Sequence, residues 1–309
     1  MSFEGEHPWR GEWPAITLGI SRNGSGVITH GNITILAGLQ MKLFLFWALA
    51  AIVVLATVVG TRLPTEASVQ SLPPERSDDD IAGFSARMYT AAGITMRYRL
   101  FVPQGLDPQK QYPIVIWLHG AGGIGVDNFR QLADDQVPGS QTWTEPANEM
   151  KHPAFVLAPQ SSVGWRAQPQ SRRSDSLGPP LRSVIGILDS LSRQYRIDQK
   201  RIYVAGQSDG GYAVWDLITN RPDRFAAAII LCGGGDPARA GRLVNLPIWV
   251  FHGSADPMVP VSEARNMIQA IQKAGGKPRY TEYKGAGHEI WSRVFAEPEL
   301  VEWVFAQHL

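Results

Sequence analysis

One stretch of this chain, RIYVAGQSDGGY from Arg201 to Tyr212, constrains the fold more than any other. Its first part, Ile202 to Ala205, is a short apolar run that is typical of a buried strand. GQSDG follows at once, from Gly206 to Gly210, with the spacing of a nucleophile elbow. A direct turn from strand to helix strains the backbone of its central residue and requires small flanking residues. The stretch therefore predicts that the hydroxyl of Ser208 is held above a sheet, at the start of a helix.

Apolar runs alternate with helical patterns through the rest of the chain, which predicts an α/β fold with a mostly parallel central sheet and helices on both faces. After the elbow helix, only Gly233 to Leu246 separates two predicted strands, so we expect no large cap domain. The predicted strands are Met96–Phe101 as a half-exposed edge strand, Ile114–Leu118, Phe155–Ala158, Ile202–Ala205, Ala227–Leu231, Ile248–Phe251 and Tyr280–Tyr283, and the predicted helices are Leu181–Tyr195, Tyr212–Asn220, Val261–Ala274 and Leu300–Phe305.

The N-terminal part of the chain differs in kind from the rest. Residues 41–67 are expected to be a signal peptide or membrane anchor, because Leu43 to Gly60 is apolar, carries no charge and follows Met41-Lys42. Residues 1–40 are then a non-native or disordered extension before the true start. Residues 68–83 are expected to be a solvated linker, and residues 84–309 the catalytic domain. The protein is predicted to be exported, as a periplasmic or secreted protein, or to be anchored by residues 43–60.

Composition excludes several classes of function. The 309 residues are 44% hydrophobic and 18% charged, as in an ordinary folded protein, and the net charge of +1 gives no reason to expect nucleic acid as a partner. The single cysteine, Cys232, excludes an internal disulfide and any multi-cysteine metal site. We expect no metal and no organic cofactor. Membrane contact is expected only through the N-terminal apolar segment if it stays uncleaved, and the oligomeric state is not predicted.

Two later loops supply the base and the acid that a serine nucleophile needs. Asp256 lies in HGSADP, directly after an apolar strand, and His288 ends the glycine-rich loop GAGH. The chain order Ser208, Asp256, His288 is the order of the catalytic residues in α/β-hydrolases. In this interpretation His288 takes the proton of Ser208, and Asp256 orients His288. The rival base, His252, is expected to brace the Asp256 loop instead.

Acyl transfer also needs donors for the oxyanion that forms on the substrate carbonyl. The first expected donor is the backbone N–H of Asp209. The second comes from the loop LHGAGG after the strand Ile114–Leu118, with Ala121 preferred over Gly122. Candidate substrate contacts are His119, Gln207, Trp143, Trp165 and Trp291, although each tryptophan could equally pack a loop onto the domain.

Four motifs in this order, WLHGAGG, GQSDGG, HGSADPMVP and GAGHEIW, resemble the α/β-hydrolase superfamily. More narrowly, the chain is similar from about Met88 to Leu309 to feruloyl-esterase-like and polyhydroxybutyrate-depolymerase-like esterases. It is also similar to predicted peptidases of the dienelactone-hydrolase and prolyl-oligopeptidase type. The resemblance implies the same triad and the same oxyanion hole, at Ala121 and Asp209. The chain departs from some secreted members in lacking their cysteine pairs.

The sequence thus predicts an exported serine hydrolase that cleaves carboxylic esters through an acyl-enzyme. Its site is expected to be open and suited to small or polymer-linked esters, as in a carboxylesterase or feruloyl-esterase-like enzyme. A serine peptidase of the prolyl-oligopeptidase-like type is the alternative, since the same triad cleaves esters and amides. A non-catalytic binding module that has kept the fold is a third interpretation.

Overall fold

The computed structural model describes residues 68–71, 80–165 and 176–309, which belong to one compact unit. The predicted extension over residues 1–40 and the predicted leader over residues 41–67 lie outside the described residues. Within the described part of the chain, every helix is too short or too polar to serve as a bilayer span.

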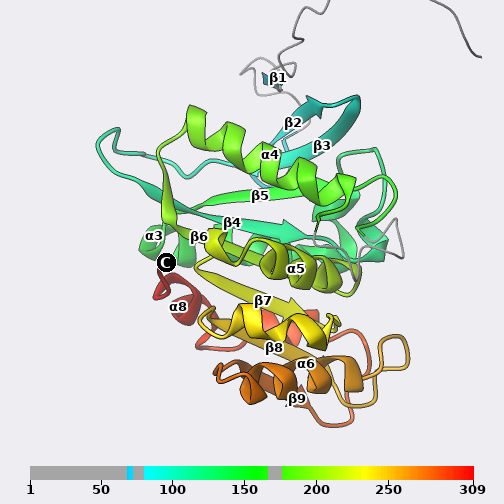
Figure 1. Cartoon of the computed structure of the whole chain (residues 1–309). Helices are drawn as coiled ribbons and strands as arrows, with labels where there is room; N and C mark the ends of the chain where they lie inside the picture. The colour runs from blue at the N-terminus through cyan, green and yellow to red at the C-terminus, as the bar shows by residue number, and fades with distance from the viewer. Residues whose placement is uncertain (1–67, 72–79, 166–175) are drawn as a thin grey trace, which may run out of the picture. The chain divides into compact units, whose positions relative to one another are not determined.

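The described strands form one sheet in the order β1-β2-β3-β5-β4-β6-β7-β8-β9 (Figure 1). The pairs from β1 to β3 and the pair β3–β5 are antiparallel, whereas every pair from β5 to β9 is parallel. The mostly parallel α/β sheet predicted from the sequence is therefore confirmed. The strands are β1 (Ser68–Ser71), β2 (Phe84–Ala91), β3 (Ile94–Phe101), β4 (Tyr112–Leu118), β5 (Phe155–Gln160), β6 (Ile197–Gln207), β7 (Ala227–Leu231), β8 (Ile248–Gly253) and β9 (Arg279–Tyr283).

Alternation along the central strands divides the core between the two faces of the sheet. In β4, Ile114 and Ile116 contribute to one buried cluster, while Val115 and Trp117 contribute to the other. Because successive side chains of a strand point to opposite faces, a continuous apolar run requires cover on both sides. Helices α4 (Pro179–Gln194), α5 (Asp209–Asn220) and α6 (Ser262–Lys273) cover the face toward the viewer in Figure 1, and α7 (Trp291–Phe295) and α8 (Leu300–Phe305) pack in the other cluster.

Two sequence predictions at the antiparallel end of the sheet are wrong. The strand over Met96–Phe101 is not at the edge, because β3 pairs with β2 on one side and β5 on the other. Its Met96 and Tyr98 side chains are accordingly buried. The predicted linker over residues 68–83 includes β1, whose backbone pairs with β2. The polar segment Ser68–Ser71 is a strand because its backbone is hydrogen-bonded to β2, and not because it is apolar.

The parallel strands bring the loops of the site to one edge of the sheet. β4 ends at the short 3₁₀ helix η1 (Ala121–Gly123), β6 at α5, and β8 and β9 at the loops that carry Asp256 and His288. The segment between β7 and β8 contains only the 3₁₀ helix η7 (Pro237–Leu243), so no cap domain is inserted there. The remaining short helices are η2 (Arg130–Leu132), η3 (Asp134–Gln136), α2 (Val137–Gln141), η4 (Thr142–Thr144), α3 (Pro146–Lys151) and η6 (Pro222–Arg224).

Candidate active site

Ser208 occupies the turn between β6 and α5 in a strained backbone conformation. Its φ of 53° and ψ of −114° lie in a region that residues with a side chain rarely adopt. Its N–H donates to the carbonyl oxygen of Leu231 at 2.8 Å, which ties the turn to β7. A Cβ on Gly206 would lie 2.5 Å from the Gly210 carbonyl oxygen, and a Cβ on Gly210 would overlap the Leu118 carbonyl oxygen. Both glycines of the motif are thus required by close backbone approach.

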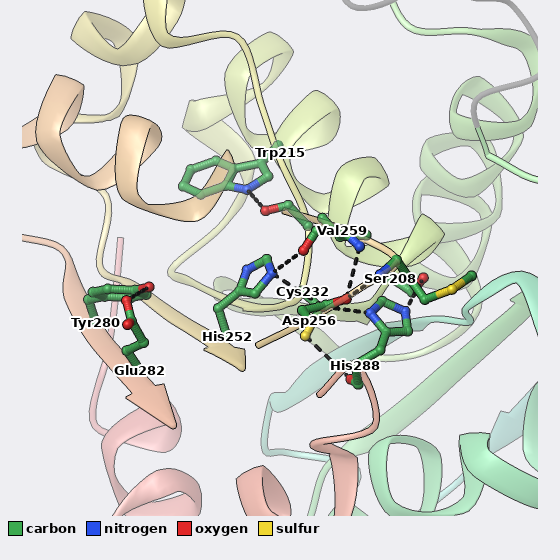
Figure 2. A network of polar contacts seen from close by, with 11 residues as sticks. Ser208, Trp215, Cys232, His252, Asp256, Val259, Tyr280, Glu282 and His288 are labelled. Carbon is green, nitrogen blue, oxygen red and sulfur yellow. Dashed lines mark hydrogen bonds and ion pairs between the residues drawn. The ribbon is translucent and has the colours of Figure 1, made fainter. Parts of the chain in front are cut away.

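His288 lies between Ser208 and Asp256, as Figure 2 shows. Its Nε2 is 2.9 Å from Ser208 Oγ, and its Nδ1 is 2.7 Å from Asp256 Oδ2. Both distances are hydrogen bonds of good length. The structure therefore brings together the three predicted residues, which come from three separate loops at the carboxyl edge of the sheet.

The surroundings of Asp256 fix both its charge and the tautomer of His288. Burial of this carboxylate would raise its pKa, but N–H groups of Val259 and Met258 donate to Oδ1 at 2.9 and 2.8 Å. Together with the hydrogen bond to His288, they hold the pKa of Asp256 below its usual value. An ionised carboxylate only accepts hydrogen bonds, so Nδ1 of His288 carries the proton. Its Nε2 then accepts the hydroxyl proton of Ser208.

His252 is fully buried and meets the triad at Asp256 rather than at Ser208. Its Nε2 lies 2.9 Å from the carbonyl oxygen of Val259 and 3.3 Å from Asp256 Oδ2. Because a carbonyl oxygen only accepts, Nε2 carries the proton and also points it toward the carboxylate. Burial lowers the pKa of His252, so the ring is held neutral. This side chain braces the Asp256 loop, the role that the sequence predicts for it.

The predicted oxyanion donors lie at the starts of the helix α5 and of the short 3₁₀ helix η1. Asp209 is the first residue of α5. Gly120 precedes η1, and the first internal hydrogen bond of η1 runs from Gly123 N–H to Gly120 O. The N–H groups of Ala121 and Gly122 precede that bond, as orphan donors at a helix start do. This places Ala121 and Gly122 on the loop expected to supply the second donor.

Comparison with known proteins agrees with this geometry. Residues 105–298, more than half of the chain, match the family described as phospholipase/carboxylesterase. The chain belongs to the phospholipase/carboxylesterase family. The resemblance to the α/β-hydrolase superfamily inferred from the four motifs is confirmed by this match. All the residues discussed above, from Leu118 to His288, lie within the matched range.

Individual members and neighbours are similar over most of the described chain. A crystal structure of a thermostable esterase has 39% sequence identity and a TM-score of 0.70, covering 74% of this chain and 64% of that one. NocK from Nocardia uniformis subsp. tsuyamanensis is 27% identical over 225 residues, or 70% of this chain. Feruloyl esterase C from Emericella nidulans is 22% identical over 62% of this chain and 72% of its own. The chain spans 62% of the length of NocK.

The structure gives no support to four of the candidate substrate contacts, because it buries their side chains among other protein groups. Trp143 packs edge-on against Phe295 and Phe305 in the core and donates its indole N–H to Gly139 O. His119 and Gln207 are completely buried. Trp165, only 2% exposed, packs against His119, with the ring centroids 4.8 Å apart and the ring planes tilted by 43°.

Trp291 lies beside the base, with its ring edge-on to His288 at 5.2 Å between centroids. It is 6% exposed, so its contact is with His288 and the role in substrate binding stays a prediction. Cys232 is buried, as expected, and its thiol lies 3.5 Å from His288 O. Burial raises the pKa of this thiol, which keeps it protonated.

A group of side chains that was not predicted from the sequence connects the elbow to the η1 loop. Gln207 Nε2 donates to Asp135 Oδ2 at 2.9 Å, and Gln136 Nε2 donates to Asp135 Oδ1 at 2.7 Å. Gln136 Oε1 in turn accepts from Gly120 N–H at 2.9 Å. No motif marks Asp135 or Gln136, which lie in the short helical segments after β4. The only signal was their place downstream of the glycine-rich loop.

Proposed function

We propose that this protein is a serine hydrolase that cleaves carboxylic esters through an acyl-enzyme formed on Ser208. One observation carries the proposal: a serine in a strained elbow is hydrogen-bonded to a histidine that is oriented by a buried, ionised carboxylate. Membership of the phospholipase/carboxylesterase family supports the same chemistry.

In the first half of the reaction, Ser208 Oγ attacks the ester carbonyl carbon while its proton passes to His288 Nε2. The imidazolium that results is stabilised by Asp256, which accepts from Nδ1–H throughout. The N–H groups of Asp209 and Ala121 stabilise the negative oxygen of the tetrahedral intermediate. When the intermediate collapses, the carbon–oxygen bond to the alcohol breaks, and His288 gives its proton to the departing alkoxide.

In the second half, a water molecule takes the place of the alcohol. His288 removes a proton from this water, whose oxygen attacks the acyl carbon. Collapse of the second intermediate breaks the bond to Ser208 Oγ, which regains the proton from His288. The products are one carboxylic acid and one alcohol, and the enzyme returns to its starting state.

For the substrate, we favour hydroxycinnamoyl-type and other bulky or polymer-linked esters at an open site. Similarity to feruloyl esterase C supports the acid part of this proposal. The short segment between β7 and β8 supports the open site, since it carries no cap domain.

We also propose that the protein is exported. The apolar run from Leu43 to Gly60 and the preceding Met41-Lys42 support export. A relative from Arthroderma benhamiae, 23% identical over 231 residues, is described as a secreted protein. N-terminal sequencing of protein recovered outside the cytoplasm tests the proposal: cleavage within residues 60–67 supports a signal peptide, whereas an intact Leu43–Gly60 in a membrane fraction supports an anchor. Recovery only in the cytoplasmic fraction would reject export.

The catalytic proposal is tested with a panel of p-nitrophenyl acetate and butyrate, methyl ferulate, a hydroxybutyrate oligomer and a dipeptidyl anilide. The full chain is compared with Ser208→Ala, and we expect ester turnover that the variant loses. Preference for methyl ferulate supports the hydroxycinnamoyl class. Faster cleavage of the anilide would favour a peptidase, and no turnover of any substrate by folded protein would favour the binding module.

A further inference from the structure

A loop after β5 touches both halves of the proposed oxyanion hole. Trp165 donates its backbone N–H to Asp209 Oδ2 at 2.8 Å, and its indole N–H to the carbonyl oxygen of His119 at 2.9 Å. Asp209 begins α5 at the elbow, and His119 begins the loop that leads to η1. One buried residue is therefore hydrogen-bonded to both segments, on which the two expected donors lie.

His119 continues this connection to the donor itself. Ser161 N–H donates to His119 Nε2 at 3.0 Å, so Nε2 is unprotonated and the proton is on Nδ1. Nδ1 then donates to Gly120 O at 2.7 Å. Burial lowers the pKa of His119 to about 4, which keeps the ring in this neutral form near pH 7.

The hydrogen bond to Gly120 O orients the N–H of Ala121, because both groups belong to one planar peptide. In a trans peptide the C=O and N–H point in opposite directions. Gly120 O also accepts from Gly123 N–H at 3.0 Å, so two donors fix one end of this peptide plane. The preceding peptide is fixed as well, since Trp165 holds His119 O and Gln136 holds Gly120 N–H. The direction of the Ala121 N–H follows from these contacts.

The loop that provides Trp165 is built tightly against the elbow. Ser161 Oγ donates to Gly164 O at 2.6 Å, which closes the turn. Gly164 has a φ of +77°, and a Cβ there would lie 3.0 Å from Asp209 Oδ2. A side chain at this position would therefore strain the backbone and crowd the Asp209 carboxylate, which accepts the hydrogen bond from Trp165 N–H.

We propose that Trp165, His119 and the Asp209 carboxylate form a brace that sets the distance and direction between the Ala121 and Asp209 N–H donors. These are positioning residues: they act on the oxyanion through the two backbone amides and do not touch the substrate. The inference rests on the proposed function, since it assigns support for the oxyanion hole of that reaction. An oxyanion donor acts mainly in the transition state, so a displaced donor lowers kcat more than it changes KM.

The test compares Trp165→Phe and Asp209→Ala with the full wild-type chain. Trp165→Phe keeps an aromatic ring against His119 and removes only the indole donor, and Asp209→Ala removes the acceptor of Trp165 N–H. Asp209→Asn keeps an acceptor oxygen and serves as the conservative rescue. Trp143→Phe is the matched control, because it removes a buried indole hydrogen bond of 2.8 Å, to Gly139 O, elsewhere in the core. The readouts are kcat and KM for p-nitrophenyl butyrate, the Ki of phenylboronic acid, which forms a tetrahedral adduct with a serine, and Tm.

We expect Trp165→Phe and Asp209→Ala each to lower kcat at least tenfold, with KM changed less than twofold and boronate affinity weakened by the same factor as kcat. Asp209→Asn should stay within threefold of wild type. Trp143→Phe should lower Tm without changing kcat or Ki.

The brace is refuted if Trp165→Phe and Asp209→Ala lower Tm but have the same kcat and Ki as the control variant Trp143→Phe. Should Trp165→Phe fail to fold, Asp209→Ala and Asp209→Asn decide the question by the same split. Ser208→Ala separates this failure from that of the proposed function. If Ser208→Ala is inactive while the brace variants behave as the control, the brace alone is wrong. If Ser208→Ala still hydrolyses the ester, the proposed function is wrong and the brace with it.

Discussion

Replacing Asp256 by asparagine should disable the base while leaving the site in place. Asp256 Oδ1 accepts from two backbone N–H groups, of Met258 and Val259. The amide oxygen of an asparagine must therefore take that position, because a backbone donor cannot be reversed. The amide NH₂ is then forced to face His288 Nδ1, at the place where Oδ2 now lies 2.7 Å away.

The consequence is a change of tautomer in His288. Facing an NH₂ donor, Nδ1 must accept, so the proton moves to Nε2. Nε2–H can no longer take the proton of Ser208. A wrong tautomer in an otherwise intact triad costs about 10⁴ in kcat, or roughly 5 kcal/mol of transition-state stabilisation.

The assay is kcat for p-nitrophenyl butyrate, with far-UV circular dichroism to show that Asp256→Asn is folded. KM should change little, because the acid does not touch the substrate. A folded Asp256→Asn variant that keeps more than a tenth of wild-type kcat would refute the tautomer argument and the role of Asp256.

Three further outcomes follow from the same contacts. Ser208→Gly should be inactive yet more stable than wild type by about 1 kcal/mol in urea unfolding, because glycine adopts the positive φ of 53° without strain. A destabilised variant would contradict stored strain at the elbow. The free energy of unfolding should fall by up to about 3 kcal/mol as the pH drops from about 6.5 to about 4, because over this range His119 is protonated in the unfolded chain but stays neutral when buried in the folded one. His119→Asn should flatten this part of the stability curve. A slope unchanged in His119→Asn would show that other groups cause it. Gly210→Ala should lose about 3 kcal/mol or fail to fold, because its Cβ overlaps Leu118 O, and a Tm equal to wild type would contradict the close approach.

The parts of the fold that the sequence predicts are those with a local cause. The run Ala227–Leu231 is apolar throughout and forms β7 with the predicted bounds. β6 begins at Ile197, upstream of the predicted Ile202, because polar residues there extend the strand and Ile197 pairs with Tyr112 of β4. β2 was not predicted: the alternation of apolar and polar residues from Phe84 to Met88 breaks at Tyr89. β3 was assigned to the edge because polar and apolar residues alternate in Met96–Phe101, as they do in a half-exposed strand.

The same distinction holds for the site. Ser208, Asp256 and His288 each lie in a short motif directly after a strand, so their approach to one another follows from the parallel sheet. The direction in which the Trp165 side chain points depends on contacts with residues far away in the sequence, and no local pattern indicates it. Trp165 and Asp209 are 44 residues apart, and no pattern in either segment indicates their hydrogen bond.

The most direct test of the account is labelling of the full chain with a fluorophosphonate, followed by peptide mass spectrometry. We predict one phosphonyl group per chain, on Ser208, with loss of ester turnover in proportion to labelling. Asp256→Asn should label far more slowly, and Ser208→Ala not at all. Complete inactivation with the label on another residue, or ester turnover that continues when Ser208 is fully labelled, would contradict the account.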